Sequence, residues 1–240
     1  MGKRIIQQRR GRGTHTYRVR RKAFNIEVRY PGRNFEGEGE ILRIIHSAGH
    51  NSPLAKILIK KEKKDLVFYN IAPEEIYEGQ KINVGGKEVK IGNIMSLKDI
   101  PTGTEVFNIE SHPGDGGRFI RSGGSRGIVH TKNKEKNKII ILMPSKKQKE
   151  FKEECRATVG IVAGGGKKEK PMVKAGNKYH KMKSRNKLWP RTSAVKMNVI
   201  DHPFGSGRGK RIKRKIAKRN APPGRKVGLL RPRRTGRKKR

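Results

Sequence analysis

The chain has 240 residues, with 61 Lys or Arg against 20 Asp or Glu and a formal net charge of +41 at pH 7. A compact state with this charge repels itself unless a polyanion neutralises it, which excludes an ordinary freely diffusing enzyme and makes nucleic acid the expected partner. Because no apolar run approaches the roughly 18 residues that a membrane-spanning helix needs, we expect no membrane partner, and we expect no small-molecule substrate.

Residues 1–34 are predicted to form a basic N-terminal extension. They hold 11 Lys or Arg and one acidic residue, Glu27. Their apolar residues are scattered, so they cannot bury enough surface to offset the entropy of ordering a self-repelling chain. We expect Arg9, Arg10 and Arg12 to bind nucleic-acid phosphates. The segment lacks the apolar stretch of a secretion signal, which favours the cytoplasm.

Residues 35–166 carry 22 basic and 17 acidic residues and can fold alone. Short apolar and β-branched runs recur between turn signals, which is typical of antiparallel β barrels. We therefore predict an all-β fold with two small barrels, over 35–86 and 87–166. The expected strands lie in runs that begin at Glu40, Leu54, Leu66, Lys81, Glu88, Glu105, Phe119 and Lys138. Residues 145–155 are expected to form one or two helical turns.

Glycines and arginines alternate through residues 112–127, HPGDGGRFIRSGGSRG. Glycines allow backbone N–H groups to approach a phosphate, and guanidinium groups bind phosphate bidentately. The candidate glycines are Gly116, Gly117, Gly123 and Gly124, and the candidate cations are Arg118, Arg121 and Arg126. The stretch matches neither a Walker A loop nor a dinucleotide-binding turn. The alternative, a pair of turns that need positive φ, is equally favoured, and both can hold together.

No metal or cofactor site is expected. Cys155 is the only cysteine, and we interpret it as a small buried apolar side chain. His46 and His50 have HxxxH spacing but no third ligand nearby, which favours a solvent-facing turn. Mg²⁺ is expected only as an ion that bridges the protein and RNA.

Residues 167–240 carry 28 basic residues against Glu169 and Asp201 and are predicted to form a basic C-terminal extension. Trp189 could stack on a base or anchor the extension. Pro203 and Gly205 favour a rigid turn around Asp201 and His202 over an acid–base pair. The candidate RNA-binding residues here are Lys178, His180, Lys187, Trp189, Arg191, His202, Arg208, Lys210, Arg211, Arg225, Lys226, Arg233 and Arg234, with Gly205 and Gly207 as close-approach glycines.

Five stretches, in chain order, resemble the family of the universal second protein of the large ribosomal subunit. They span 103–129, 155–166, 174–180, 195–207 and 220–237, and the forms HPFGSG and APPGRKVG resemble its archaeal branch. The resemblance implies an oligonucleotide-binding (OB) barrel followed by an SH3-like barrel, with long basic arms extended in large-subunit rRNA. It implies roles in assembly and subunit association, with other ribosomal proteins and the small subunit as partners. It also implies that Asp201 and His202 lie near the peptidyl-transferase centre.

Two other functions are weighed against a structural ribosomal role. An RNA-processing enzyme using Asp201 and His202 would need a metal cluster or a second catalytic group, and the sequence shows neither. A DNA-packaging protein needs basic tails but not long nonrepetitive strings such as VKMNVIDHPFGSG. We therefore predict a structural protein and not an enzyme.

Overall fold

The structure, a computed structural model, describes residues 2–33, 35–61, 65–133, 135–167, 169–207, 216–234 and 236. The chain divides into two compact units. We call Arg21–Pro171 the β unit, and Met1–Arg20 together with Met172–Arg240 the terminal unit. Of the helices described, none is long and apolar enough to cross a membrane.

The described part of the β unit contains one sheet of ten strands, in the order β3-β2-β1-β4-β5-β10-β6-β7-β8-β9. Neighbouring strands are antiparallel except β4 and β5, which pair in parallel at Val84 and Ile94. The strands are β1 (Gly37–Ile45), β2 (Leu54–Ile59), β3 (Leu66–Ile71), β4 (Lys81–Val84), β5 (Ile94–Ser96), β6 (Glu105–Phe107), β7 (Gly127–Asn133), β8 (Lys138–Leu142), β9 (Gln148–Lys152) and β10 (Arg156–Val159). The predicted all-β class is confirmed for this unit.

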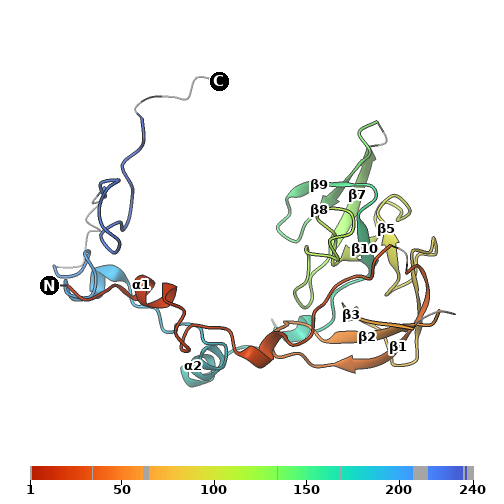
Figure 1. Cartoon of the computed structure of the whole chain (residues 1–240), viewed down its shortest axis with the longest axis horizontal. Helices are drawn as coiled ribbons and strands as arrows, with labels where there is room; N and C mark the ends of the chain where they lie inside the picture. The colour runs from red at the N-terminus through yellow and green to blue at the C-terminus, as the bar shows by residue number, and fades with distance from the viewer. Residues whose placement is uncertain are drawn as a thin grey trace. The chain divides into compact units, whose positions relative to one another are not determined.

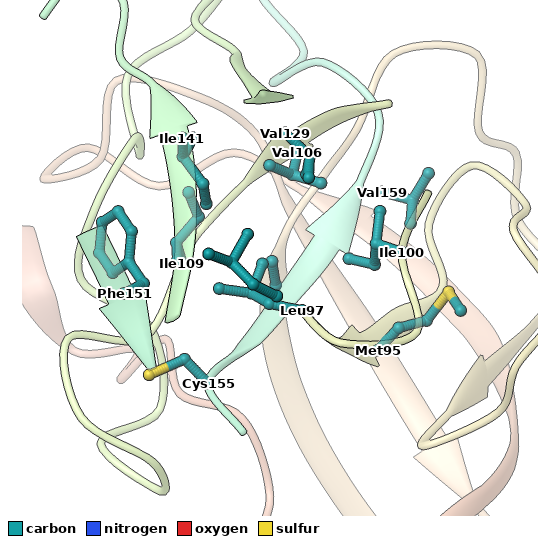
Figure 2. Close-up of a cluster of buried hydrophobic side chains, with 12 residues drawn as sticks. Met95, Leu97, Ile100, Val106, Ile109, Val129, Ile141, Phe151, Cys155 and Val159 are labelled. Atoms are coloured by element: carbon teal, nitrogen blue, oxygen red, sulfur yellow. The ribbon is translucent and has the colours of Figure 1, made fainter. Parts of the chain in front are cut away.

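The sheet has two halves, each with its own core. Figure 1 shows β1, β2 and β3 grouped in one part of the β unit and β7, β8 and β9 in another, with β5 and β10 between them. The first half buries a cluster around Ile41, Ile57 and Ile82. The second half buries a cluster that includes Leu97 and Ile141, drawn in Figure 2. A third cluster, which includes Leu54 and Phe107, joins strands of both halves, so they pack as one unit.

Several segments of the β unit differ from expectation. The runs from Glu88 and Phe119 form strands only from Ile94 and Gly127 onward, and β10 was not among the expected strands. The helical prediction for residues 145–155 is wrong, because Gln148–Lys152 pairs with β8 as the strand β9. Its one inward side chain, Phe151, packs edge-to-face on Phe119, while the charged residues stay exposed, as suits an edge strand. Residues 21–33 belong to the β unit, although the sequence analysis placed them in the N-terminal extension. Val28 and Tyr30 are buried on either side of the exposed Arg29, and Pro31 is buried as well, which explains their place.

The terminal unit contains α1 (Ile6–Gly11), α2 (Ala175–Ser184) and a 3₁₀ turn at Ala194–Lys196. Neither helix buries a residue. The two ends of the chain meet here: Lys3 N donates to Ile200 O (2.8 Å), and the Asn186 amide donates to the carbonyl oxygens of His15 and Arg18. These polar contacts, with little apolar burial, hold the segments of this unit together.

Candidate nucleic-acid interface

Two carboxylates, those of Glu110 and Asp115, organise the glycine-rich loop of residues 112–127. The Glu110 carboxylate, fully buried, accepts hydrogen bonds from Gly114 N and Gly116 N (both 3.2 Å). The Asp115 carboxylate accepts from Ser111 N (2.9 Å) and Gly117 N (3.1 Å). These backbone N–H groups therefore already donate to side chains of the protein itself. Phosphate contact at Gly116 and Gly117 stays a prediction, and the hydrogen bonds of their N–H groups do not support it.

Close packing explains why these positions are glycines. Gly117 has φ +91°, and a Cβ there would lie 2.6 Å from the Asn108 carbonyl oxygen. A Cβ on Gly123 would lie 2.7 Å from the Gly164 carbonyl oxygen, and one on Gly124 would lie 2.5 Å from Gly165 Cα. The sequence left two roles open for these glycines, phosphate binding and tight turns. The structure supports the tight turns, because a side chain at these positions would clash with the neighbouring backbone.

A buried ion pair fixes the carboxylate that holds the loop. Arg156, at the start of β10, is 4% exposed and donates from Nη2 to Glu110 Oε1 (2.9 Å), while its backbone N–H donates to Oε2 (2.9 Å). Arg156 Nη1 donates to Pro31 O (2.9 Å). All three guanidinium nitrogens of Arg156 and both carboxylate oxygens of Glu110 have hydrogen-bond partners, which is the condition under which two buried charges are tolerated. The pair ties the loop to β10 and to the segment that precedes β1.

The ion pair continues into a polar network between the two halves of the sheet. The Tyr30 hydroxyl donates to Asn108 O (2.8 Å) and lies 2.6 Å from Thr158 Oγ1. Asn70 Nδ2 donates to Thr158 Oγ1 (3.1 Å), and Asn108 Nδ2 donates to Asn70 Oδ1 (2.9 Å). Burial raises the pKa of Tyr30, so its hydroxyl remains a donor. The network joins β3 and β10, one strand from each half of the sheet, and gives the loop a rigid base.

An open groove of about 590 Å³ brings together two of the predicted arginines, Arg118 and Arg121. Arg121 is held in place, because Nη1 donates to Gly117 O and Nη2 donates to Val28 O, both at 3.2 Å. Arg118 and Arg29 have exposed side chains on the same groove, where they pair with Asp115 (3.7 Å) and Glu27 (3.4 Å). A guanidinium fixed by the protein beside exposed cations is suited to a phosphate.

The same groove carries an aromatic pair that the sequence analysis did not identify. The Phe24 and His50 rings pack edge-to-face with centroids 5.2 Å apart, and Phe24 is 56% exposed. Ser47 Oγ lies 2.8 Å from His50 Nδ1 and fixes the imidazole. Burial, and then the charge of Arg121, lower the pKa of His50, which keeps the ring neutral at pH 7. Exposed rings beside cations are the features that bind an unstacked base.

The third predicted arginine of the loop lies outside this groove. Arg126 pairs with Glu105, with 3.0 Å between Nε and Oε1. The predicted solvent-facing turn at His46 and His50 is half right: His50 is partly buried and contributes to the groove. In the described ranges, no group of three or more His, Cys, Asp or Glu is arranged to hold a metal.

The predicted residues of the terminal unit are mostly exposed cations. Arg9 and Arg10 lie on α1, Arg12 follows it, and Lys178 and His180 lie on α2. All five are exposed. The remaining described cations of the predicted set are exposed as well: Lys187, Arg191, Arg225, Lys226, Arg233 and Arg234. Arg208, Lys210 and Arg211 lie outside the described residues.

Trp189 is partly buried rather than free. Lys178 Nζ lies 5.5 Å from the centroid of its ring, so one contact of the indole is with α2. This contact supports the anchoring alternative, and stacking of the ring on a base stays a prediction.

Asp201 and His202 form a turn and not a catalytic pair. Phe204 N donates to His202 Nδ1 (3.1 Å), which leaves Nε2 of the neutral ring as a donor. The Asp201 carboxylate pairs with Lys3 (3.8 Å), and no bond between the two side chains is present in this described stretch. Gly205 completes the turn, because a Cβ there would lie 2.4 Å from Asn198 C, whereas a Cβ on Gly207 would meet nothing within 4 Å. The arrangement positions the histidine and provides no partner for proton transfer.

Sequence reasoning missed Phe24, Arg29 and His50 as parts of one site. They are far apart in sequence from Arg118 and Arg121, and no short-range spacing connects them. The one residue in the sequence that could have indicated this contact is Gly49, where a Cβ would lie 2.0 Å from the Ala23 carbonyl oxygen. That glycine allows the turn that carries Phe24 to rest on the loop that carries His50.

Comparison with known proteins identifies the family of this chain. The family model described as "Ribosomal Proteins L2, C-terminal domain" matches residues 90–222. The protein named large ribosomal subunit protein uL2 from Archaeoglobus fulgidus is 46% identical over 98% of this chain and 99% of its own. Its counterparts from Methanococcoides burtonii and Methanococcus maripaludis are each 44% identical, over 99% of this chain and 100% of their own. These relatives are named as ribosomal proteins, and the chain belongs to the ribosomal protein L2 family.

Proposed function

We propose that this chain is a structural, non-enzymatic constituent of the large subunit of the cytoplasmic ribosome, where it binds rRNA and supports assembly and subunit association. The observation that carries the proposal is the charge of the terminal unit, which has 32 Lys or Arg against one carboxylate, that of Asp201. No protein surface of ordinary composition neutralises this excess, whereas an RNA backbone does. Family membership supports the choice of the large ribosomal subunit.

The finer architecture belongs to the same proposal. We assign residues 35–86 to an OB barrel and residues 87–166 to an SH3-like barrel. The separate cores of the two halves support this, as does the single parallel contact between β4 and β5. We assign the terminal unit to basic arms that adopt their final path on RNA, because its described helices bury no residue.

The groove that carries Arg118 and Arg121 is proposed to hold one unpaired nucleotide of rRNA. Phe24 and His50 provide the stacking surface, and Arg121 provides a fixed contact for the phosphate. The exposed cations of the terminal unit contact phosphates without reading sequence. His202 donates from Nε2 to RNA near the peptidyl-transferase centre, and Mg²⁺ bridges protein carboxylates to phosphate where the two approach.

A competition experiment separates this function from DNA packaging. The full chain is bound to labelled large-subunit rRNA at fixed salt and challenged with unlabelled folded rRNA or duplex DNA. We expect rRNA to compete far better, because the loops and the groove recognise folded RNA. Removing residues 172–240 should flatten the dependence of log K on log salt by about 0.7 to 0.9 for each lost phosphate contact. Equal competition by duplex DNA would favour the packaging alternative.

A further inference from the structure

A second groove of the β unit is lined by glutamates, whereas the groove proposed to bind RNA is lined by three arginines. Its volume is about 390 Å³, and it is lined by parts of four segments that include Glu74, Val89, Glu105 and Ile161. Val89 and Ile91 are 41% and 40% exposed and provide an apolar wall. We call this the acidic groove. The volume is at the lower end of the range of roughly 300–1,000 Å³ for pockets that hold ligands.

The acidic groove is built from rigid parts. Gly160 N donates to Glu105 O (2.8 Å), Gly92 N donates to Val159 O (3.0 Å), and Glu74 N donates to Ile161 O (2.9 Å). These bonds join the four lining segments. A Cβ on Gly160, at φ +114°, would lie 3.2 Å from Ile91 Cγ2, so the floor fits closely against its apolar wall. The hollow is therefore formed before any ligand arrives.

The charge on this groove favours a cationic occupant over RNA. The lining carries three carboxylates, those of Glu74, Glu75 and Glu105, and its described residues include no Lys or Arg. Glu105 pairs with Arg126 beside the groove, whereas Glu74 and Glu75 form no ion pair within the described chain. Two carboxylates left without cations in a chain of 61 Lys and Arg repel phosphate and attract a cationic partner.

We propose that the acidic groove docks an extended Lys- or Arg-bearing segment of a neighbouring ribosomal protein. An apolar side chain of that segment rests on Val89 and Ile91, and its cations pair with Glu74 and Glu75. Protein interfaces usually combine an apolar centre with a polar rim, as this apolar wall and its neighbouring carboxylates do. The inference rests on the proposed function, since such neighbours exist only in the subunit, and it adds that one face of the β unit is turned to protein.

Photo-cross-linking in assembled subunits tests this proposal. A benzophenone amino acid at position 89 of the full chain should cross-link to a basic segment of another ribosomal protein. The double variant Glu74→Gln with Glu75→Gln removes the two carboxylates proposed to pair with the cations of the docked segment and should lower that cross-link about twofold to thirtyfold. The matched control, Glu38→Gln with Glu150→Gln, removes two exposed, ion-paired carboxylates outside the groove and should leave it unchanged. Ile91→Lys, at an exposed position, should lower the cross-link as well.

Cross-links to rRNA, to this chain or to a second copy would overturn the docking proposal, as would an absent cross-link or an undiminished one in the double variant. The amount of wild-type chain in subunits is measured in the same samples. A chain that enters subunits but cross-links to RNA at position 89 refutes only the docking proposal. A chain that does not enter subunits refutes the proposed function and the docking proposal together.

Discussion

Replacing Glu110 by glutamine should destabilise the β unit severely. Both carboxylate oxygens face donors: Oε1 accepts from Gly116 N, Arg156 Nε and Arg156 Nη2, and Oε2 accepts from Gly114 N and Arg156 N. An amide placed either way therefore points its NH₂ group at N–H groups. The substitution also leaves the Arg156 guanidinium, 4% exposed, without its counter-charge.

Removing one partner of a buried ion pair costs about 3–5 kcal/mol. At about 2–4 °C per kcal/mol for a unit of this size, Glu110→Gln should lower the midpoint of thermal unfolding by about 6–20 °C. The assay is far-UV circular dichroism of the full chain in high-salt buffer, which follows the strands. Glu150→Gln, which removes an exposed pair with Lys138, is the control and should shift the midpoint by no more than about 4 °C. A Glu110→Gln shift as small as that of the control would refute the reasoning.

Three further substitutions test separate parts of the account. Gly117→Ala should destabilise far more than Gly114→Ala by the same assay, because both have positive φ but only the Gly117 position would clash with Asn108; similar losses would contradict the packing argument. The pKa of His50 is lowered on folding, so the unfolded chain binds its proton first and stability falls as pH drops below about 6.5. His50→Gln should weaken that pH dependence, and an unchanged urea-unfolding profile between pH 7 and pH 5 would count against it. In assembled subunits, His202→Gln should keep peptide-bond formation with an unchanged pH profile, while His202→Ala should impair assembly; loss of the chemical step in fully assembled Gln subunits would reopen a role in proton transfer.

The strands of the β unit were largely predictable from sequence because their apolar runs are short, regularly spaced and bounded by turns. Two strands were not predicted. One is β10, whose four residues include two polar ones, Arg156 and Thr158, and the other is β9, since Gln148–Lys152 contains one apolar residue, Phe151, among polar ones. Its pairing depends on β8, which local sequence does not reveal. The helix α2 was missed because it buries nothing and has no side-chain cap, so it carries neither an apolar stripe nor a start signal.

The candidate site was predictable in its cations and not in its geometry. The glycine-rich loop was identified from its composition, but its N–H groups are occupied by Glu110 and Asp115. Nothing in the sequence around Glu110 indicates a partner 46 residues away in Arg156. Contacts at such separations are set by the topology of the sheet, which a single sequence does not specify.

The central claim, a structural place in the large ribosomal subunit, is tested most directly by sedimentation. Ribosomal subunits from cells that express the tagged full chain are separated on a gradient after a high-salt wash. The account predicts that the chain stays with the large subunit, because the surrounding rRNA holds it by more than exposed charge contacts. Release of the chain into the free-protein fraction, or sedimentation with chromosomal DNA, would contradict it.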